Sequence, residues 1–104
     1  MKEPDEEARA WVADEVLEYL VQHPNAQDTL EGVCDWWLLE RRVRRTVGEV
    51  EAALSELVAK GFLAARRGKD GRTHYQINLR EKQNIRRHLQ ERDRLRSAAK
   101  VARS

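Results

Sequence analysis

Apolar residues recur at intervals of three and four along three segments of the chain, which is the spacing of one buried face of an α-helix. The first segment ends before Pro24, because the residue before a proline disfavours the α region, and it predicts a helix over 5–22. The second predicts a helix over 28–40, and the third a helix over 46–60 that is closed by Gly61 as a glycine C-cap. The apolar positions are Trp11, Val12, Val16, Leu17, Leu20 and Val21 in the first, Leu30, Val33, Cys34, Trp37 and Leu38 in the second, and Val47, Val50, Leu54, Leu57 and Val58 in the third. Three amphipathic helices sharing one core are therefore expected.

Helix starts are marked by side chains that can cap a first turn. A Ser, Thr, Asp or Asn followed three residues later by Glu is such a signature, because each side chain accepts a hydrogen bond from the other residue's backbone N–H. This signature occurs as Asp28 with Glu31, Thr46 with Glu49, and Asn78 with Glu81. It predicts the starts of the second helix, the third helix and a further helix near the C-terminus.

Two short runs on either side of Asp70-Gly71 predict a β-hairpin over 62–78, because Asp-Gly between alternating runs is the strongest short-range hairpin signal. With the turn centred on Asp70-Gly71, one face holds Phe62, Ala64, Arg66, Tyr75, Ile77 and Leu79, of which all but Arg66 are expected to cover the core. Arg67, Lys69, Arg72 and His74 are then left toward solvent. Over 79–103 the chain predicts a basic helix with a thin apolar stripe at Ile85, Leu89 and Leu95, whose last turns are expected to fray.

The order helix, helix, helix, hairpin, helix is that of a winged helix-turn-helix domain. The fold class predicted is therefore mainly α with a small β-hairpin: a three-helix core, a wing and a C-terminal basic helix in a single domain over 1–104.

Charge is divided unevenly along the chain although the formal net charge is only +2. Residues 1–40 hold two bases against eleven acids, a balance of −9, and residues 41–104 hold eighteen bases against seven acids, a balance of +11. One half is expected to repel polyanions and the other to attract them. The hydrophobic fraction of 40% suffices for one modest core.

The candidate reactive groups are few. Cys34 is the only cysteine, so an internal disulfide or a cysteine-cage metal site cannot form, and a buried thiol is favoured over a redox sensor. His23, His74 and His88 lack a spacing that suggests a shared metal, and no nucleophile with a base or phosphate-binding glycine loop is recognised. We expect no enzyme, no cofactor and no metal. With no signal-peptide or membrane-spanning run, a cytoplasmic protein is expected.

The run from Glu31 to Tyr75, less than half of the chain, resembles the core of small bacterial winged-helix regulators of the ArsR and MarR types. The resemblance lies in an L-x-x-L-x-x-x-G-x-[LI] helix exit and in a D-x-R wing motif, which stand at Leu54, Leu57, Gly61 and Leu63 and at Asp70-Gly71-Arg72. It implies a winged-helix transcriptional regulator in which Arg72 contacts DNA. The Val33-Cys34-Asp35 stretch resembles the cysteine motif of metal-sensing ArsR proteins, but the second cysteine is absent, so metal sensing is not implied.

The face of the third helix opposite its apolar stripe raises a question about DNA reading. At about 100° per residue it presents Gly48, Ala52, Ser55, Glu56 and Ala59, with Glu49 beside them. Arg, Lys, Asn and Gln, which make bidentate contacts with base edges, are missing from it.

Three interpretations stay open. In the first, the small face fits a groove of duplex DNA while basic residues before the helix and in the wing grip phosphates. The candidate DNA-binding residues are Arg41, Arg42, Arg44, Arg45, Thr46, Gly48, Ala52, Ser55, Arg66, Arg67, Lys69, Arg72 and His74. In the second, the small face packs against a helix of a protein partner or a second copy. In the third, it is an ordinary solvent-facing surface.

Two further features have alternative partners. Trp36 lies off the apolar stripe and either packs under a loop or stands exposed as an anchor for a partner. The terminal basic helix has too few acids to pair its bases, so it contacts a polyanion or the acidic first helix of a second copy. A homodimer through the terminal helices is expected.

Overall fold

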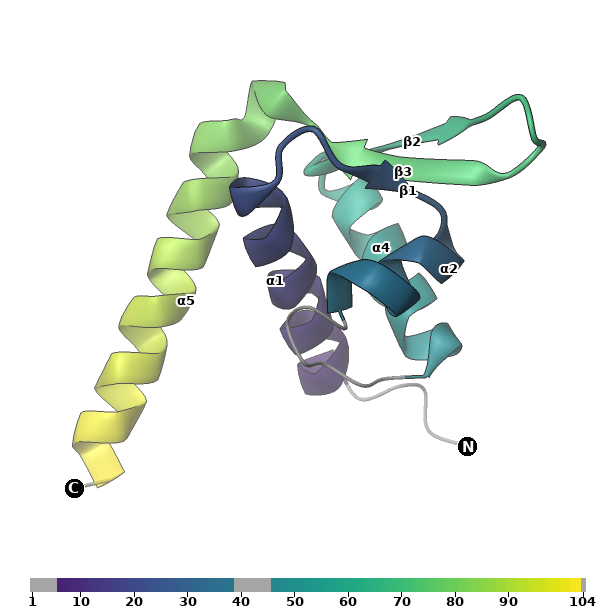
Figure 1. Cartoon of the computed structure of the whole chain (residues 1–104). Helices are drawn as coiled ribbons and strands as arrows, with labels where there is room; N and C mark the ends of the chain where they lie inside the picture. The colour runs from purple at the N-terminus through teal and green to yellow at the C-terminus, as the bar shows by residue number, and fades with distance from the viewer. Residues whose placement is uncertain (1–5, 39–45, 104) are drawn as a thin grey trace.

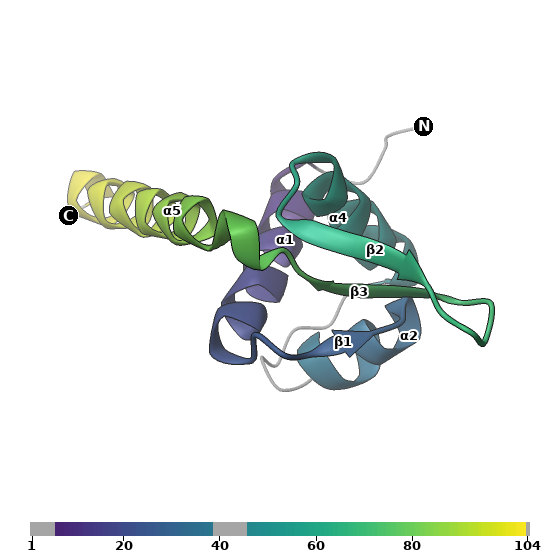
Figure 2. The same cartoon turned by 90° about the horizontal axis from the view of Figure 1, so that it is seen from above.

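The computed structural model describes residues 6–38 and 46–103, with side chains over 9–38 and 46–98. It is mostly helical with a small three-stranded antiparallel sheet, consistent with a winged-helix fold (Figure 1). The elements are α1 (Glu6–Gln22), β1 (Gln27–Asp28), α2 (Leu30–Gly32), the π-helical η1 (Val33–Trp37), α4 (Val47–Ala59), β2 (Leu63–Arg67), β3 (Thr73–Ile77), the 3₁₀ turn η2 (Leu79–Glu81) and α5 (Lys82–Arg103). The strand order is β1-β3-β2, and the sheet covers one end of the layer formed by α1, α2 and α4 (Figures 1 and 2).

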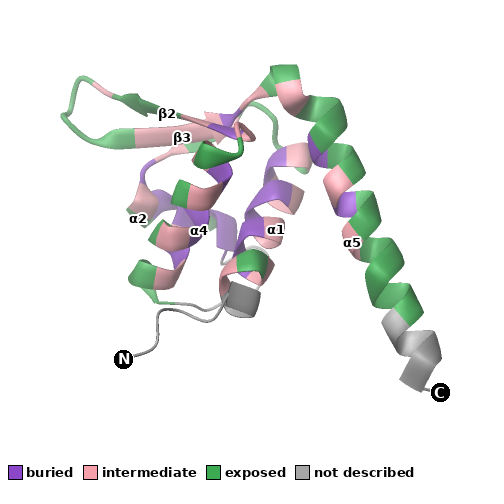
Figure 3. Cartoon of the chain, turned by 180° about the vertical axis from the view of Figure 1, so that it is seen from behind, coloured by how far each residue is buried: buried purple, intermediate pink, exposed green. Residues whose placement is uncertain are grey.

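One hydrophobic core joins every helix to the sheet, and the buried surfaces of α1 and α4 face each other (Figure 3). Its members come from the three predicted helices, from β2 and β3 and from α5: Val12, Ala13, Val16, Leu17, Leu20, Val33, Trp37, Leu38, Val50, Ala53, Leu54, Leu57, Leu63, Ile77, Ile85 and Leu89. Val47 is an exception, because it stands at the first position of α4 and is 58% exposed.

The ends of α4 are those the sequence predicts. The Thr46 hydroxyl accepts from the Glu49 backbone N–H at 3.2 Å, and the Glu49 carboxylate accepts from the Thr46 backbone N–H at 3.0 Å, which completes a capping box. Beyond the C-cap Lys60, Gly61 adopts a φ of 82°, in the left-handed region that glycine enters without steric cost.

The start of the second helix is different from the prediction. Thr29, not Asp28, is the N-cap, and its hydroxyl accepts from the Gly32 N–H at 3.3 Å. Asp28 belongs to β1, opposite Tyr75, and its carboxylate accepts from the Thr29 N–H at 2.8 Å. A Cβ on Gly32 would stand 1.9 Å from that carboxylate, so any larger residue here would displace the Asp28 side chain. The last part of the predicted range, 39–40, lies outside the described residues.

The hairpin register is shifted by one residue from the prediction. Leu63 pairs with Ile77 and Ala65 with Tyr75, so the residues that share the core-facing side with Ile77 are Leu63 and Ala65 rather than Ala64. Leu63 and Ile77 are 3% and 5% exposed. Because side chains alternate along a strand, this slip exchanges the two faces of β2.

The connection between the strands explains the shift. The Gly68 N–H donates to the Arg72 carbonyl at 2.8 Å, which leaves a loop of Lys69, Asp70 and Gly71 with its centre at Asp70. Gly71 has a φ of 78°, as expected where a turn is followed by a left-handed residue. A three-residue loop therefore replaces the two-residue turn predicted from Asp-Gly. Leu79, which was also predicted to cover the core, lies in η2 and is 56% exposed.

The first half of α5 is packed on α1, where Ile85 and Leu89 are 0% and 7% exposed. The second half diverges from α1 and projects from the domain (Figures 1 and 2), and Leu95 on it is 55% exposed. The predicted apolar stripe is confirmed at its first two positions, and the third faces solvent.

Charged side chains reinforce this packing. His88 Nε2 lies 2.7 Å from Asp14 Oδ1, and Arg92 donates to Glu18 at 2.5 Å. Acidic α1 of the same chain therefore pairs with part of basic α5, a partner that was not among the two expected alternatives, a polyanion and α1 of a second copy.

Candidate nucleic-acid interface

The predicted DNA-binding residues fall into three parts of the chain. Arg41, Arg42, Arg44 and Arg45 lie outside the described residues. Thr46, Gly48, Ala52 and Ser55 belong to the start and the outward side of α4, and Arg66, Arg67, Lys69, Arg72 and His74 belong to the hairpin. Helix α4 begins at the end of the helical layer away from the sheet and ends beneath β2 (Figure 1). At about 1.5 Å per residue, its 13 residues hold the two ends roughly 20 Å apart.

The N-terminus of α4 already contains a negative charge. The Glu49 carboxylate accepts from the N–H and from the hydroxyl of Thr46, at 3.0 and 2.9 Å. A phosphate at this helix end would therefore meet that carboxylate as well as the favourable helix dipole. Any phosphate contact here depends on the basic residues that precede the helix.

The outward side of α4 is small and open. Gly48 and Ser55 are exposed, Ala52 is half-buried, and a Cβ added to Gly48 would find nothing within 4 Å. Glu56, which the sequence left without a partner, lies 3.8 Å from the Arg9 guanidinium of α1. That pair reduces the negative charge that this side would present to a phosphate backbone.

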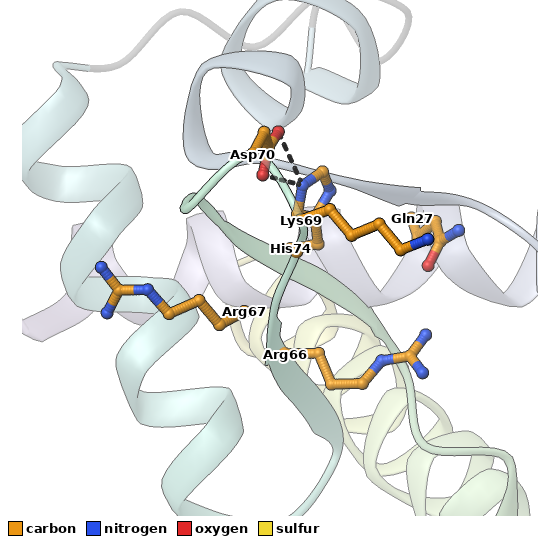
Figure 4. Close-up of a pocket in the computed structure, with 7 residues that line it drawn as sticks. Gln27, Arg66, Arg67, Lys69, Asp70 and His74 are labelled. Carbon is orange, nitrogen blue, oxygen red and sulfur yellow. Dashed lines mark hydrogen bonds and ion pairs between the residues drawn. The ribbon is translucent and has the colours of Figure 1, made fainter.

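The hairpin carries its cations on two different faces. Arg66 stands opposite His74, and Gln27 of β1 stands opposite Gln76, so these side chains share the outer face of the sheet, away from the core. Arg67 stands opposite Thr73 on the face that contains Leu63 and Ile77. Neighbouring arginines in the sequence thus point to opposite sides of the wing (Figure 4).

The outer face forms an open hollow of about 640 Å³ at the base of the wing tip (Figure 4). Its lining comes from β1, β2, β3 and the loop: Gln27, Arg66, Arg67, Gly68, Lys69, Asp70 and His74. Gln27 was not predicted, because a two-residue strand has no recognisable period and pairs with a strand far along the chain.

Asp70 organises the turn and positions His74. Its carboxylate accepts from the Arg72 N–H at 3.0 Å and lies 3.2 Å from His74 Nε2. The hydrogen bond from the Arg72 N–H, followed by that with His74, lowers the pKa of Asp70 below its ordinary value of 3.8. The carboxylate is therefore ionised at neutral pH and engaged within the wing.

The inner side of the wing faces α2 and α4 across a hollow of about 230 Å³, which is lined by Thr29, Leu30, Glu31, Glu51, Arg72, Thr73 and Tyr75. Burial raises the pKa of the Tyr75 hydroxyl, and the charges of Glu51 and Glu31 raise it further. The negative charges of Glu31 and Glu51 therefore extend into the hollow that Arg72 also lines. Arg72, which the resemblance assigns to DNA, has two acidic neighbours that the sequence did not place beside it.

The other candidate side chains, Trp36 and Cys34, both belong to η1. Trp36 is 68% exposed, which resolves its two alternatives in favour of the surface. Cys34 is half-buried, and burial followed by the charges of Asp35 and Glu31 raises the pKa of its thiol.

Among the described residues, no cluster of His, Cys, Asp and Glu could hold a metal ion. No helix in the described parts is both long and apolar enough to cross a membrane.

Comparison with known proteins gives a likeness of structure. No protein-family model matches the sequence, and no curated protein is similar to it. Among solved structures, the chain is similar to that of a transcriptional regulator from Clostridium thermocellum, with a TM-score of 0.71 and 13% identity. The match covers 96% of this chain and 97% of the other. At this identity the likeness concerns the fold, which the two chains share over nearly their whole length.

Proposed function

We propose that this protein is a winged-helix transcriptional regulator of the cytoplasm that binds duplex DNA, largely through phosphate contacts. The observation that carries the proposal is a hairpin that holds Arg66, Arg67 and Lys69 exposed around one open hollow. The similar fold of a transcriptional regulator supports it.

The proposed contacts lie toward the two ends of α4. Basic residues before the helix, Arg41, Arg42, Arg44 and Arg45 with Thr46, bind phosphates at its start, and the wing binds them near its other end. The roughly 20 Å length of α4 exceeds the about 12 Å width of a major groove, so one helix is long enough to connect contacts on both of its walls. The small side chains Gly48, Ala52 and Ser55 then permit a close approach of the helix to the groove.

Base reading contributes little in this arrangement. Arg, Lys, Asn and Gln are missing from the outward face of α4, and a glutamate carboxylate accepts hydrogen bonds mainly from cytosine amino groups. Affinity should therefore be mostly electrostatic and similar for different sequences, and it should fall steeply with salt.

Fluorescence anisotropy of a labelled random duplex, measured from about 50 to 200 mM salt, tests the proposal. Four phosphate contacts give a slope of about −3.6 in log affinity against log salt, so affinity should fall by about 150-fold over that range. Micromolar binding with such a slope is the expected result. The absence of binding at about 50 mM salt contradicts the proposal.

The exposure of Trp36 favours a second candidate, a protein-interaction module that uses the small face of α4. Ala52→Arg separates the two candidates, because DNA binding should tolerate or gain from an added cation, whereas a packed helix interface should be disrupted. Since Ala52 is half-buried, Ser55→Arg repeats the test at a fully exposed neighbour.

We also infer that the protein forms a homodimer through its terminal helices. Leu95 is exposed beside a hollow of about 440 Å³ along α1 and α5, which is lined by Asp14, His88, Glu91, Arg92, Leu95 and Arg96. A second copy would remove this apolar surface from water. Sedimentation equilibrium should show a dimer, and a monomer at about 100 μM would contradict this inference.

A further inference from the structure

We propose that the wing binds DNA phosphates through its outer face, with Arg66, Lys69, Gln27 and His74, and that its inner face is closed to phosphates by Glu31 and Glu51. This inference rests on the proposed DNA binding and specifies which of the wing's cations bind the phosphates. The sequence places Arg66, Arg67, Lys69 and Arg72 in one basic cluster. The observed register divides that cluster between two surfaces.

On the outer face, polar groups from two strands and the loop converge. The side chains of Arg66 and Lys69 extend to the same side of the hairpin as the Gln27 amide (Figure 4). Together with Arg67, which also lines the hollow, three cations and an amide N–H donor surround one open space, a combination suited to the oxygens of a phosphate.

The hollow is also held in shape. His74 Nε2 is bound to Asp70 at 3.2 Å, and the ring lies so close to the backbone that a Cβ on Gly68 would stand 2.8 Å from it. Asp70 is the only carboxylate among the lining residues, and it already accepts from His74 and from the Arg72 N–H. Its oxygens are thus engaged within the wing, and the cations around it remain available to a ligand.

On the inner face, the surroundings oppose an anion. Arg72 lines the same hollow as Glu31 of α2 and Glu51 of α4. A phosphate that approached Arg72 from this side would meet two carboxylates for one guanidinium, and repulsion would offset the attraction.

The wing offers a matched test, because each hollow can lose one arginine of its own. Arg66→Ala removes one charge from the outer hollow, and Arg72→Ala removes one from the inner hollow. Arg67 also lines the outer hollow and is left unchanged in both variants. Both variants change the net charge equally and lie in the same hairpin, so their long-range effects on DNA are nearly the same. The Arg72→Ala change retains the backbone N–H that donates a hydrogen bond to the Asp70 carboxylate.

We expect the outer variant Arg66→Ala to weaken binding of a random duplex several-fold and to make the salt slope shallower by about 0.9, the value for one lost phosphate contact. The inner variant Arg72→Ala should lose no more than about twofold in affinity and keep its slope. Equal losses, or a larger loss for the inner variant, would overturn the assignment.

A second variant tests the carboxylates. In Glu31→Gln with Glu51→Gln the inner face loses its negative charge, so binding should tighten several-fold, and a further Arg72→Ala change should then weaken it. Unchanged affinity in the double glutamine variant would refute the role of these carboxylates.

Titration with inorganic phosphate, followed by the NMR signal of the Gln27 side-chain amide, distinguishes the source of the ligand. If the wild-type protein does not bind duplex at all, the proposed function fails, and a phosphate shift at Gln27 without DNA binding identifies a site for free phosphate. If the duplex binds and Arg66→Ala and Arg72→Ala lose affinity equally, only the face assignment fails.

Discussion

Replacement of Ile85 by alanine tests whether α5 is an integral part of the domain. Ile85 is fully buried, in the half of the helix that packs on α1. The change removes three buried carbon atoms, worth about 0.8 kcal/mol each, and leaves a cavity, so the free energy of unfolding should fall by about 3 kcal/mol. With an m-value of about 1.5 kcal/mol/M, the urea midpoint should fall by about 2 M.

Leu95 provides the matched control, because it lies on the same helix and is 55% exposed. Leu95→Ala should change the free energy of unfolding by less than about 0.5 kcal/mol in a dilute sample. If a second copy covers Leu95, the cost of this change should grow with protein concentration, since dimerisation stabilises only the folded state. Urea titrations followed by circular dichroism, at two protein concentrations, measure both effects.

One result would refute the reasoning. If Ile85→Ala lowers the free energy of unfolding by less than about 1 kcal/mol, the helix contributes little to the core. Equal effects of both variants in the dilute sample would have the same meaning, because a buried and an exposed position would then be energetically alike.

The remaining predictions concern the wing turn, the small face of α4 and the dependence of stability on pH. Gly71→Ala should destabilise the protein by about 1–2 kcal/mol because of its positive φ, whereas Gly48→Ala, which meets no neighbour, should stabilise the helix by up to about 1 kcal/mol. Thermal melts compare the two, and a destabilising Gly48→Ala would contradict the open environment described for Gly48. Because the pKa of Asp70 is lowered on folding, its contribution to stability is complete above its ordinary value of 3.8 and is lost as the pH falls through the lowered value. An NMR titration of the Asp70 carboxyl should have its midpoint below 3.8, and a midpoint at or above 3.8 would be inconsistent with the Arg72 and His74 hydrogen bonds.

Local features of this protein follow from the sequence alone. The capping box of Thr46 and Glu49 and the helix end at Gly61 involve groups only a few residues apart, so the pattern specifies them without knowledge of the rest of the chain. The helical stripes and the existence of a hairpin around Asp70 were predicted for the same reason.

The candidate site was predicted in composition but not in arrangement. Its basic residues are recognisable in the sequence, yet a one-residue difference in loop length decides which of them share a face. The sequence does not specify this loop length, because the length depends on the burial of Leu63 against the core and on the left-handed conformation of Gly71.

Tertiary structure alone decided the contacts between distant segments. Asp14 and His88 are 74 positions apart, and Gln27 reaches the wing only because β1 pairs with β3. Each such contact requires the core to form first, since a long loop must close before the contact contributes any stability. The sequence by itself therefore determined the helical stripes, the caps of α4 and the supply of cations, whereas the packed core determined the cap of α2 and the face on which each cation lies.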